Sequence, residues 1–456
     1  MDARGARDVH FLEGKTIFIV GGGIAGSTLV AGFRKLWNPA LKPPTVVIFD
    51  RDSSDPTLRR HEESFTVSVS GQNEAGGLPA IQKLGLLESV LASAVAGQDQ
   101  ATGCFKIWGT DWHVLQSIRR KPIHGLPTSS LRISRRNLRR VLLDAAQGWS
   151  HGRVQWDSRC LSAARLENGR LRVRILRPES ALRSQATDMG KPSDGKKAKE
   201  VWIEEEQDCD LLIVADGANS KLRDSLRPAD RLQYIGVVLR GGLSRFDDSP
   251  LPSVPGDDWG FATSPDGASC FLSPVDDKSL VWAVGHAEWN PTPKLDSSDA
   301  SAMRAVIERG RQLGAAFAEP FEAIVARTDP KIVLCINGRD KLPFAHEDIA
   351  HMPVIFIGDS NHAVGPFAGA GANLALADGW NLAEELCRGA SLVDAVAIYD
   401  SISVPRAASV LDESRQAVRR FYGGGWRETI FWGLFAIRRW MSWAMAKLMR
   451  RAMWWP

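Results

Sequence analysis

A short apolar strand that leads directly into a glycine-rich turn constrains the fold of this chain more than any other feature. Residues 15–20 are rich in β-forming side chains, and residues 27–36 have helical character. The turn between them has the spacing G-x-G-x-x-G, formed by Gly21, Gly23 and Gly26. A second apolar run, Thr45–Phe49, ends at Asp50. This order predicts a βαβ unit with an acidic residue that closes its second strand.

Each residue of this motif has a physical role in binding a dinucleotide. Gly21 permits the tight turn, Gly23 lets the backbone approach a pyrophosphate, and Gly26 allows the helix to pack closely on the strand. The helix N-terminus offers free N–H groups and a positive dipole end to the phosphates. Asp50 can accept hydrogen bonds from ribose hydroxyls. A glycine-rich turn without a ligand is the alternative, but the flanking strands and the acid favour a dinucleotide site.

Two further motifs follow apolar runs later in the chain. Residues 210–215 end in the pattern D-G-x-x-S-x-x-R, from Asp216 to Arg223. Residues 353–358 lead into a loop rich in small residues, from Asp359 to Asn373. With the first motif, they make the chain resemble the FAD-dependent aromatic-hydroxylase superfamily, typified by para-hydroxybenzoate hydroxylase, and more closely the tetracycline-inactivating flavin monooxygenases. The resemblance covers roughly residues 15–415.

This resemblance implies an α/β fold in which a Rossmann-like FAD domain is interleaved with a β-rich substrate domain, plus C-terminal helices. Short β-like runs from Leu232 to Val284, separated by Gly, Pro and Asp, indicate an antiparallel sheet. We expect a discontinuous FAD domain over residues 1–100, 128–228 and 344–400. We expect the substrate domain over residues 101–127 and 229–343, and the C-terminal helices over 401–456.

The resemblance also implies cofactor-binding roles by position. Asp359 resembles the aspartate that hydrogen-bonds the ribitol or ribose of FAD, and Asp216 resembles the second aspartate, near both FAD and the approach of the nicotinamide. Arg135 resembles the arginine that contacts the cofactor, with Arg136 as an adjacent alternative. The loop and helix start expected against the isoalloxazine contribute Pro366, Gly369, Gly371, Ala372 and Asn373.

In this family, NADH or NADPH reduces FAD, and the reduced FAD reacts with O₂ to form a flavin hydroperoxide that delivers one oxygen atom. The resemblance therefore implies a monooxygenase acting on an aromatic or polycyclic small molecule. Arg240 and Gln72, with Asn73, are the candidate catalytic residues that would orient the substrate or the flavin. A sheet-edge surface arginine and a turn cap are the alternative interpretations. For His362 we predict a structural hydrogen bond to the backbone rather than proton transfer.

Other functions stay open on this evidence. A flavin reductase or halogenase on the same scaffold, or an FAD-binding module without turnover, are the alternatives. The sequence lacks the Trp-x-Trp-x-Ile-Pro signature expected of a halogenase and the G-x-S-x-G of a hydrolase. The six cysteines form no C-x-x-C pair, so we expect no metal site. The formal net charge of +4 is too small to indicate a nucleic-acid partner.

The C-terminal residues differ in composition from the rest of the chain. Residues 426–456 hold six of the 16 tryptophans, and residues 423–456 hold six basic residues against one acid. Helical spacing places four apolar side chains on one face, Met441, Met445, Leu448 and Met449. We expect either an interfacial membrane helix or a helix that packs on the body. The sequence shows no secretory signal and no apolar run of about 18 residues, so we expect a cytoplasmic protein, membrane-associated if the first alternative holds.

Overall fold

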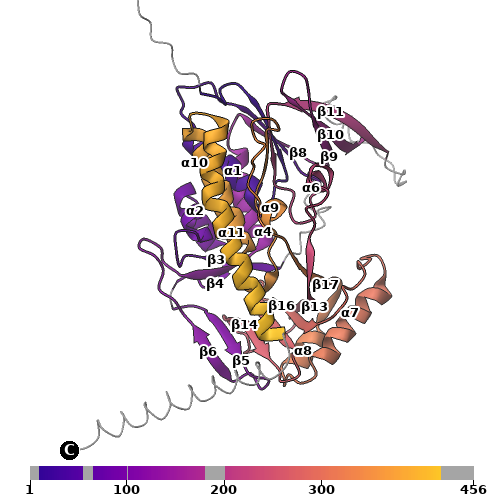
Figure 1. The fold of residues 1–456 in the computed structure, drawn as a ribbon. Helices are drawn as coiled ribbons and strands as arrows, with labels where there is room; N and C mark the ends of the chain where they lie inside the picture. Colours follow the sequence, from indigo (N-terminus) through magenta and orange to yellow (C-terminus); the bar gives the residue numbers. More distant parts are fainter. Residues whose placement is uncertain (1–9, 55–64, 100, 180–200, 423–456) are drawn as a thin grey trace, which may run out of the picture.

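The computed structural model describes residues 10–54, 65–99, 101–179 and 201–422 (Figure 1). One end of the molecule is built on a parallel sheet in the order β18-β12-β1-β2-β8. These strands are Val354–Phe356, Leu211–Val214, Thr16–Val20, Thr45–Phe49 and Gly152–Gln155. Four of them coincide with the apolar runs predicted from the sequence. These strands are apolar along their whole length because both faces of a parallel sheet are covered.

The two faces of this parallel sheet pack against different elements. Ile17 and Ile19 of β1 belong to a core shared with three helices, α1 (Ile24–Leu36), α4 (Arg135–Gln147) and α10 (Gly371–Arg388). Phe18 and Val20 face the other way, into a core shared with a small antiparallel sheet and helix α6. The strands of that sheet, in the order β11-β10-β9, are Trp202–Cys209, Leu171–Pro178 and Arg159–Arg165. Helix α6 is Lys221–Leu226.

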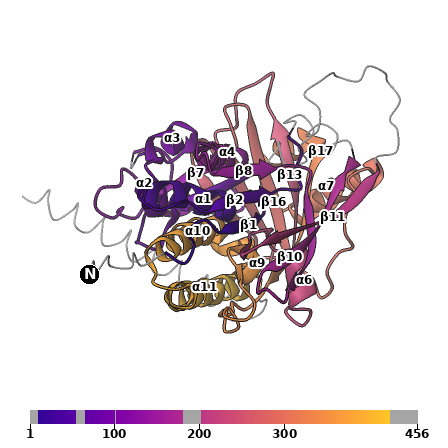
Figure 2. The ribbon, with the colours of Figure 1, turned by 90° about the horizontal axis from the view of Figure 1, so that it is seen from above.

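Helices α10 and α11 (Leu392–Tyr422) lie side by side along one flank of the molecule (Figures 1 and 2). A glycine brings α10 close to α1, because a Cβ on Gly379 would lie 2.6 Å from the carbonyl oxygen of Ala25. The remaining helices of this end are short: α2 (Gly77–Leu84), α3 (Leu87–Ala92), α9 (Asp359–His362) and the 3-10 turn η2 (Pro366–Ala368).

The other end of the molecule is a seven-stranded sheet in the order β17-β13-β16-β15-β14-β5-β6. Its strands are Thr328–Asp340, Gln233–Arg245, Ser279–Ala287, Ser269–Pro274, Trp259–Thr263, Phe105–Trp108 and Val114–Ile118. All neighbours are antiparallel except β14 and β5, which confirms the expected antiparallel sheet. Helices α7 (Ala300–Leu313) and α8 (Phe321–Ala326) cover one face, where Trp282 packs edge-on against Phe321.

A three-stranded sheet, β3-β7-β4, lies between the two ends (Figure 1). Its strands are Thr66–Ser70, Ser130–Ser134 and Ala94–Ala96. Alternation along β7 sends Leu131 and Ile133 into the helical core and Arg132 to the opposite face. Ser134 then caps α4, because its hydroxyl accepts a hydrogen bond of 3.2 Å from the N–H of Asn137. Strand β7 therefore passes directly into helix α4 at Ser134.

The predicted fold class is confirmed, because an α/β region with a parallel sheet alternates along the chain with a β-rich region. Strands of the parallel sheet come from residues 16–20, 45–49, 152–155, 211–214 and 354–356, and those of the seven-stranded sheet from 105–118 and 233–340. The proposed domain limits agree with this distribution of strands but stay a prediction. Helix α11 begins at Leu392, before the limit proposed at residue 401.

None of the helices in the described ranges is sufficiently long and apolar to cross a membrane. The tryptophan-rich tail, residues 423–456, lies outside the described residues, and its two alternatives stay predictions.

Candidate active site

The glycine-rich turn has the geometry that its sequence predicts. Gly21 has φ of +107°, and a Cβ there would lie 2.4 Å from the carbonyl oxygen of Ala215. A Cβ on Gly26 would lie 2.1 Å from the carbonyl oxygen of Gly21, so only glycine fits where α1 meets β1. At Gly23, by contrast, an added Cβ would meet no atom within 4 Å. Helix α1 starts directly afterwards without a side-chain cap, which leaves open space and N–H groups for a phosphate.

Asp50 holds this turn in place. Its Oδ2 accepts hydrogen bonds of 2.7 Å from the N–H of Gly22 and 2.8 Å from Arg139. Arg139 also donates to Asp52 at 2.7 Å and to the carbonyl oxygen of Gly22 at 2.7 Å. The sequence motifs do not single out Arg139, although it lies one helical turn after Arg135 on α4. The contact of Asp50 with a ribose stays a prediction, because both carboxylate oxygens already have protein partners.

A cavity of about 1200 Å³ lies between the three-stranded sheet, the seven-stranded sheet and the start of α10. Most of the predicted cofactor and substrate residues line it: Gln72, Asn73, Arg135, Asp359, Pro366, Gly369, Gly371, Ala372 and Asn373. The opposite wall consists of apolar side chains from the seven-stranded sheet, Leu239, Phe261, Phe271, Val281, Ala283 and Leu334. One cavity therefore joins the third sequence motif to an aromatic sheet face.

Asp359 is an acceptor at the cavity wall. It follows β18 at Gly358, whose φ of +59° turns the chain into α9. Burial raises the pKa of the Asp359 carboxyl, and the charge of Arg135 opposes that shift. Its carboxylate accepts no hydrogen bond from any residue that the structure describes, so it is available to a ligand hydroxyl.

Asp216 presents a second acceptor at the end of β12. Its Oδ2 accepts a hydrogen bond of 3.1 Å from the N–H of Lys221, whereas its buried Oδ1 has no partner within the described ranges. Burial raises the pKa of this carboxyl. Arg223, at the end of the same motif, donates to the carbonyl oxygen of Ser360 at 3.0 Å and so ties the second motif to the third.

The start of α10 faces the cavity with its backbone. Ala370 precedes the helix without a side-chain cap, so the first N–H groups stay available. The Asn373 side chain already has backbone partners. Its Oδ1 accepts hydrogen bonds from the N–H of Ser70 at 2.7 Å and of Gly77 at 3.0 Å, and its Nδ2 donates one to the carbonyl oxygen of Ser68 at 3.0 Å. Asn373 therefore ties α10 to β3 and α2, and only its backbone is available to a ligand.

His362 pairs with a carboxylate rather than with the backbone, so that prediction is wrong in its partner. Its Nε2 lies 2.6 Å from Oδ2 of Asp378, a fully buried residue. The other carboxylate oxygen of Asp378 accepts a hydrogen bond of 2.7 Å from Arg406. Burial disfavours protonated His362, but the Asp378 carboxylate outweighs it and raises the imidazole pKa. Burial likewise disfavours ionised Asp378, but His362 and Arg406 hold its pKa well below the usual value. This buried network joins α9, α10 and α11.

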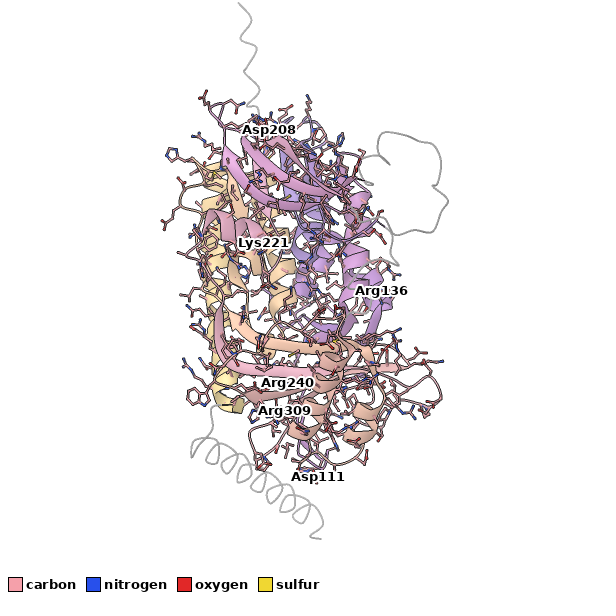
Figure 3. All side chains as sticks on the ribbon, turned by 90° about the vertical axis from the view of Figure 1, so that its right-hand side faces the viewer. Asp111, Arg136, Asp208, Lys221, Arg240 and Arg309 are labelled. Atoms are coloured by element: carbon pink, nitrogen blue, oxygen red, sulfur yellow. The ribbon has the colours of Figure 1, made fainter. Side chains whose placement is uncertain are left out.

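Arg240 does not belong to the candidate site. Its neighbour Leu239 lines the cavity, whereas the buried Arg240 side chain is on the other face of β13 and forms two hydrogen bonds to Glu288, of 2.6 and 2.9 Å. Figure 3 shows Arg240 at the seven-stranded end. It is therefore neither a group at the cavity nor a sheet-edge surface arginine, because β13 is paired with a strand on each side.

Gln72 does lie at the cavity, where its Oε1 accepts a hydrogen bond of 2.8 Å from the exposed Arg120. Asn73 closes the turn through its backbone: its carbonyl oxygen accepts a hydrogen bond of 3.0 Å from the N–H of Gly76. The turn-cap alternative therefore fits Asn73 rather than Gln72. A direct role of Gln72 toward the substrate stays a prediction.

The sequence profile of a family described as FAD binding domain matches residues 57–414. The chain is also 37% identical over 409 residues to the monooxygenase cfoF of Aspergillus candidus, which covers 90% of this chain and 92% of that protein. The chain belongs to the FAD-binding-domain family of monooxygenases. The resemblance to FAD-dependent aromatic hydroxylases is thereby confirmed, and the protein is an FAD-dependent monooxygenase.

More distant relatives agree with this membership. The 3-amino-4-hydroxybenzoate 2-monooxygenase of Streptomyces cremeus is 25% identical over 422 residues, covering 89% of this chain and 87% of that protein. The structure of Klebsiella pneumoniae HpxO complexed with FAD and uric acid superposes with a TM-score of 0.67 at 19% identity, covering 93% and 92% of the two chains. The tetracycline destructase Tet(55) has a TM-score of 0.61 at 14% identity, covering 91% of each chain. These two structures support the fold.

Proposed function

We propose that this monooxygenase uses NADH or NADPH to reduce its FAD and transfers one oxygen atom from O₂ to an aromatic or polycyclic small molecule. The observation that carries the proposal is a single cavity in which the cofactor motif and an aromatic sheet face are opposite walls. A flavin placed against the start of α10 would face a substrate ring placed against Phe261 and Phe271.

The residues present fit FAD. The open space at Gly23 and the uncapped start of α1 suit a pyrophosphate. Oδ1 of Asp216 and the carboxylate of Asp359, which accept no hydrogen bond from the described residues, are acceptors for sugar or ribityl hydroxyls. We assign Arg135, whose charge acts on Asp359, to the same cofactor. Bound FAD supplies hydride acceptance and O₂ activation, which no side chain can provide.

The protein's own contribution is to orient the substrate and exclude water. The rings of Phe261 and Phe271 lie 5.1 Å apart at an angle of 54°, and Phe105 lies 5.9 Å from Phe261. Together with Leu239 and Leu334 they form an apolar wall that would hold a planar ring by stacking and area burial. Excluding water from such a site suppresses side reactions of reactive oxygen species.

The relatives support an aromatic or polycyclic substrate. The name of the Streptomyces cremeus relative states an aminohydroxybenzoate substrate, and the HpxO structure contains uric acid, a fused-ring compound. A cavity of about 1200 Å³ has room for a flavin ring and a polycyclic ligand together.

The test is anaerobic reduction of the FAD-loaded protein by NADPH or NADH, followed by O₂ and a panel of aromatic and polycyclic compounds. We expect the absorbance of oxidised flavin, near about 450 nm, to fall on reduction. With heavy-isotope-labelled O₂, we expect one labelled oxygen atom in a product identified by mass spectrometry.

Each alternative gives a different result in this experiment. A flavin reductase would consume NAD(P)H without a labelled product, and a halogenase would give a halogenated product only when halide is added. A protein that binds FAD without turnover would keep oxidised flavin in the presence of either nicotinamide.

A further inference from the structure

Arg132 is a buried cation at the point where the three-stranded and seven-stranded sheets meet. It lies on β7, lines the cavity and is only 4% exposed. Its guanidinium carbon lies 5.3 Å from the ring centroid of Phe271, on β15 of the seven-stranded sheet. Arg132 therefore borders the aromatic wall on which the proposed substrate would rest.

Every hydrogen-bond partner of Arg132 is neutral. Its Nε donates to Ser273 Oγ at 3.1 Å, and Nη1 donates to Ser68 Oγ at 2.9 Å. Its Nη2 donates to the carbonyl oxygen of Thr66 at 3.0 Å and also to the Thr66 hydroxyl. An arginine has five N–H donors, so one donor on Nη1 has no acceptor within the described parts of the chain.

This charge has no counter-ion among the residues that the structure describes. Two other arginines, one buried and one half-buried, do have one: Arg240 pairs with Glu288, and Arg415 pairs with Asp340. The buried Arg223 instead donates to the backbone carbonyl oxygens of Ser360 and Ala218 and does not line the cavity. A buried cation without an opposite charge is costly unless a ligand supplies that charge. Burial lowers the pKa of Arg132 to about 9, which leaves the guanidinium mostly charged at neutral pH.

Neighbouring groups fix the guanidinium in place. The hydroxyls of Thr66 and Ser273 lie 3.0 Å apart, and Ser273 donates onward to the carbonyl oxygen of Pro274 at 3.1 Å. Ser68 Oγ, which accepts from Nη1, lies 4.0 Å from the Cβ position of Gly369 in the loop expected against the flavin. The cation is thus held between the aromatic wall and that loop.

The cavity lining as a whole also has more positively than negatively charged side chains. The lining arginines outnumber the lining acids even without Arg406, which pairs with Asp378: Arg119, Arg120, Arg132, Arg135 and Arg339, against Asp99, Asp359 and Glu413. An excess of positive charge in a cleft raises the local concentration of anions.

We infer that Arg132 binds an acidic oxygen, a carboxylate or a phenolate, of the aromatic substrate and thereby orients the ring beside the flavin. This inference rests on the proposed function, and it adds the charge of the substrate and the residue that recognises it. Arg132 selects anionic aromatic ligands over neutral ones of the same shape.

The test compares matched anionic and neutral ligands on the FAD-loaded enzyme. The probes are 2-naphthoate against its methyl ester, and 4-nitrophenolate against 4-nitroanisole, with binding followed by the perturbation of flavin absorbance. In the unaltered enzyme we expect the anion of each pair to bind at least about tenfold more tightly. Arg132→Gln should weaken anion binding about ten- to 100-fold and leave the neutral ligands within about threefold, and Arg132→Lys should retain part of the preference.

The matched control is Arg309→Gln, at an exposed arginine on α7 outside the cavity lining (Figure 3), which should change neither affinity. Equal affinity for anion and ester in the unaltered enzyme would overturn the inference, and this measurement needs no variant. So would an Arg132→Gln protein that binds both ligands of a pair equally less well.

Two further outcomes are distinguishable. If Arg132→Gln shifts the flavin reduction potential or the ligand-free flavin spectrum while the anion preference persists, the charge acts on the flavin and the inference is wrong. If the unaltered protein holds FAD and prefers anions but NAD(P)H and O₂ give no oxygenated product, the proposed function fails while anion recognition by Arg132 stands.

Discussion

Two sets of buried charges in this molecule differ in how they are compensated. The first set, the framework pairs, consists of Asp378 with His362 and Arg406, Asp340 with Arg415, and Arg240 with Glu288. The second set, on the cavity wall, consists of Arg132 and Asp359, which have no ion pair within the described chain. Removing one partner of a pair inside the chain leaves the other charge uncompensated and destabilises the fold, whereas an unpaired charge at a cavity can be compensated by a ligand.

The largest effect should come from breaking the most buried framework pair. Asp378→Ala leaves His362 and Arg406 without their carboxylate and removes acceptors for Gly358 and Ser403. We expect the free energy of unfolding to fall by about 3–5 kcal/mol in urea titrations at neutral pH. Asp412→Asn, at an exposed position of α11, is the control and should change it by less than about 0.5 kcal/mol.

A second framework variant separates stability from binding. Arg240→Met leaves Glu288 without its partner, and we expect a loss of about 3 kcal/mol in unfolding free energy. The folded fraction should keep the affinity of the unaltered enzyme for FAD and for 2-naphthoate, because Arg240 faces away from the cavity. Loss of ligand affinity without loss of stability would place Arg240 in the binding machinery and contradict the comparison.

The cavity-wall acid should show the reverse pattern. Asp359→Ala removes a ligand acceptor that has no protein partner, so the FAD-free protein should unfold within about 1 kcal/mol of the unaltered one. FAD affinity, measured by reconstituting the FAD-free protein and following flavin fluorescence, should fall by about tenfold or more. Unchanged FAD affinity with a large loss of stability would move Asp359 into the framework set.

The smallest effect should be a pH dependence of the stability that the His362–Asp378 pair contributes. The raised pKa of His362 means that its contribution to stability is full below the ordinary value of 6.5 and is lost as the pH rises through the folded-state pKa. The lowered pKa of Asp378 keeps the carboxylate contribution present above 3.8, and that contribution is lost only as the pH falls below this value.

Between about pH 6 and pH 9, the unaltered protein should therefore lose on the order of 1 kcal/mol relative to His362→Gln. Thermal unfolding midpoints of both proteins across this range provide the measurement. Parallel curves for the two proteins would show that His362 does not titrate in that window.

Features that depend on neighbours in the sequence were predictable. The strand before Gly21, the positive φ of Gly21 and the Ser134 cap follow from local pattern, and the structure has all three. Asp359 and Gln72 both line the cavity, and each directly follows or adjoins a recognisable strand end, while their roles toward a ligand stay predictions.

Features that depend on distant contacts were not predictable. Arg132 and Arg139 both belong to a basic stretch that looks solvent-exposed in the sequence. Arg132 is buried by Thr66 and Ser273, which are 66 and 141 residues away, and Arg139 is fixed by Asp50, 89 residues away. The predicted position of Arg240 at the site was wrong for the same reason. Its partner Glu288 is 48 residues away, and the whole sheet determines which face of β13 points to the cavity.

Helix α11 contacts both ends of the molecule. Its 31 residues extend about 46 Å, from beside α10 to β13 of the seven-stranded sheet (Figure 1). Along this length Arg406 donates to Asp378, Ser414 donates to the carbonyl oxygen of Gly365 next to η2, and the Tyr422 hydroxyl is hydrogen-bonded to that of Ser269 in the seven-stranded sheet. A hinge motion between the two sheets would have to break these contacts along a single helix.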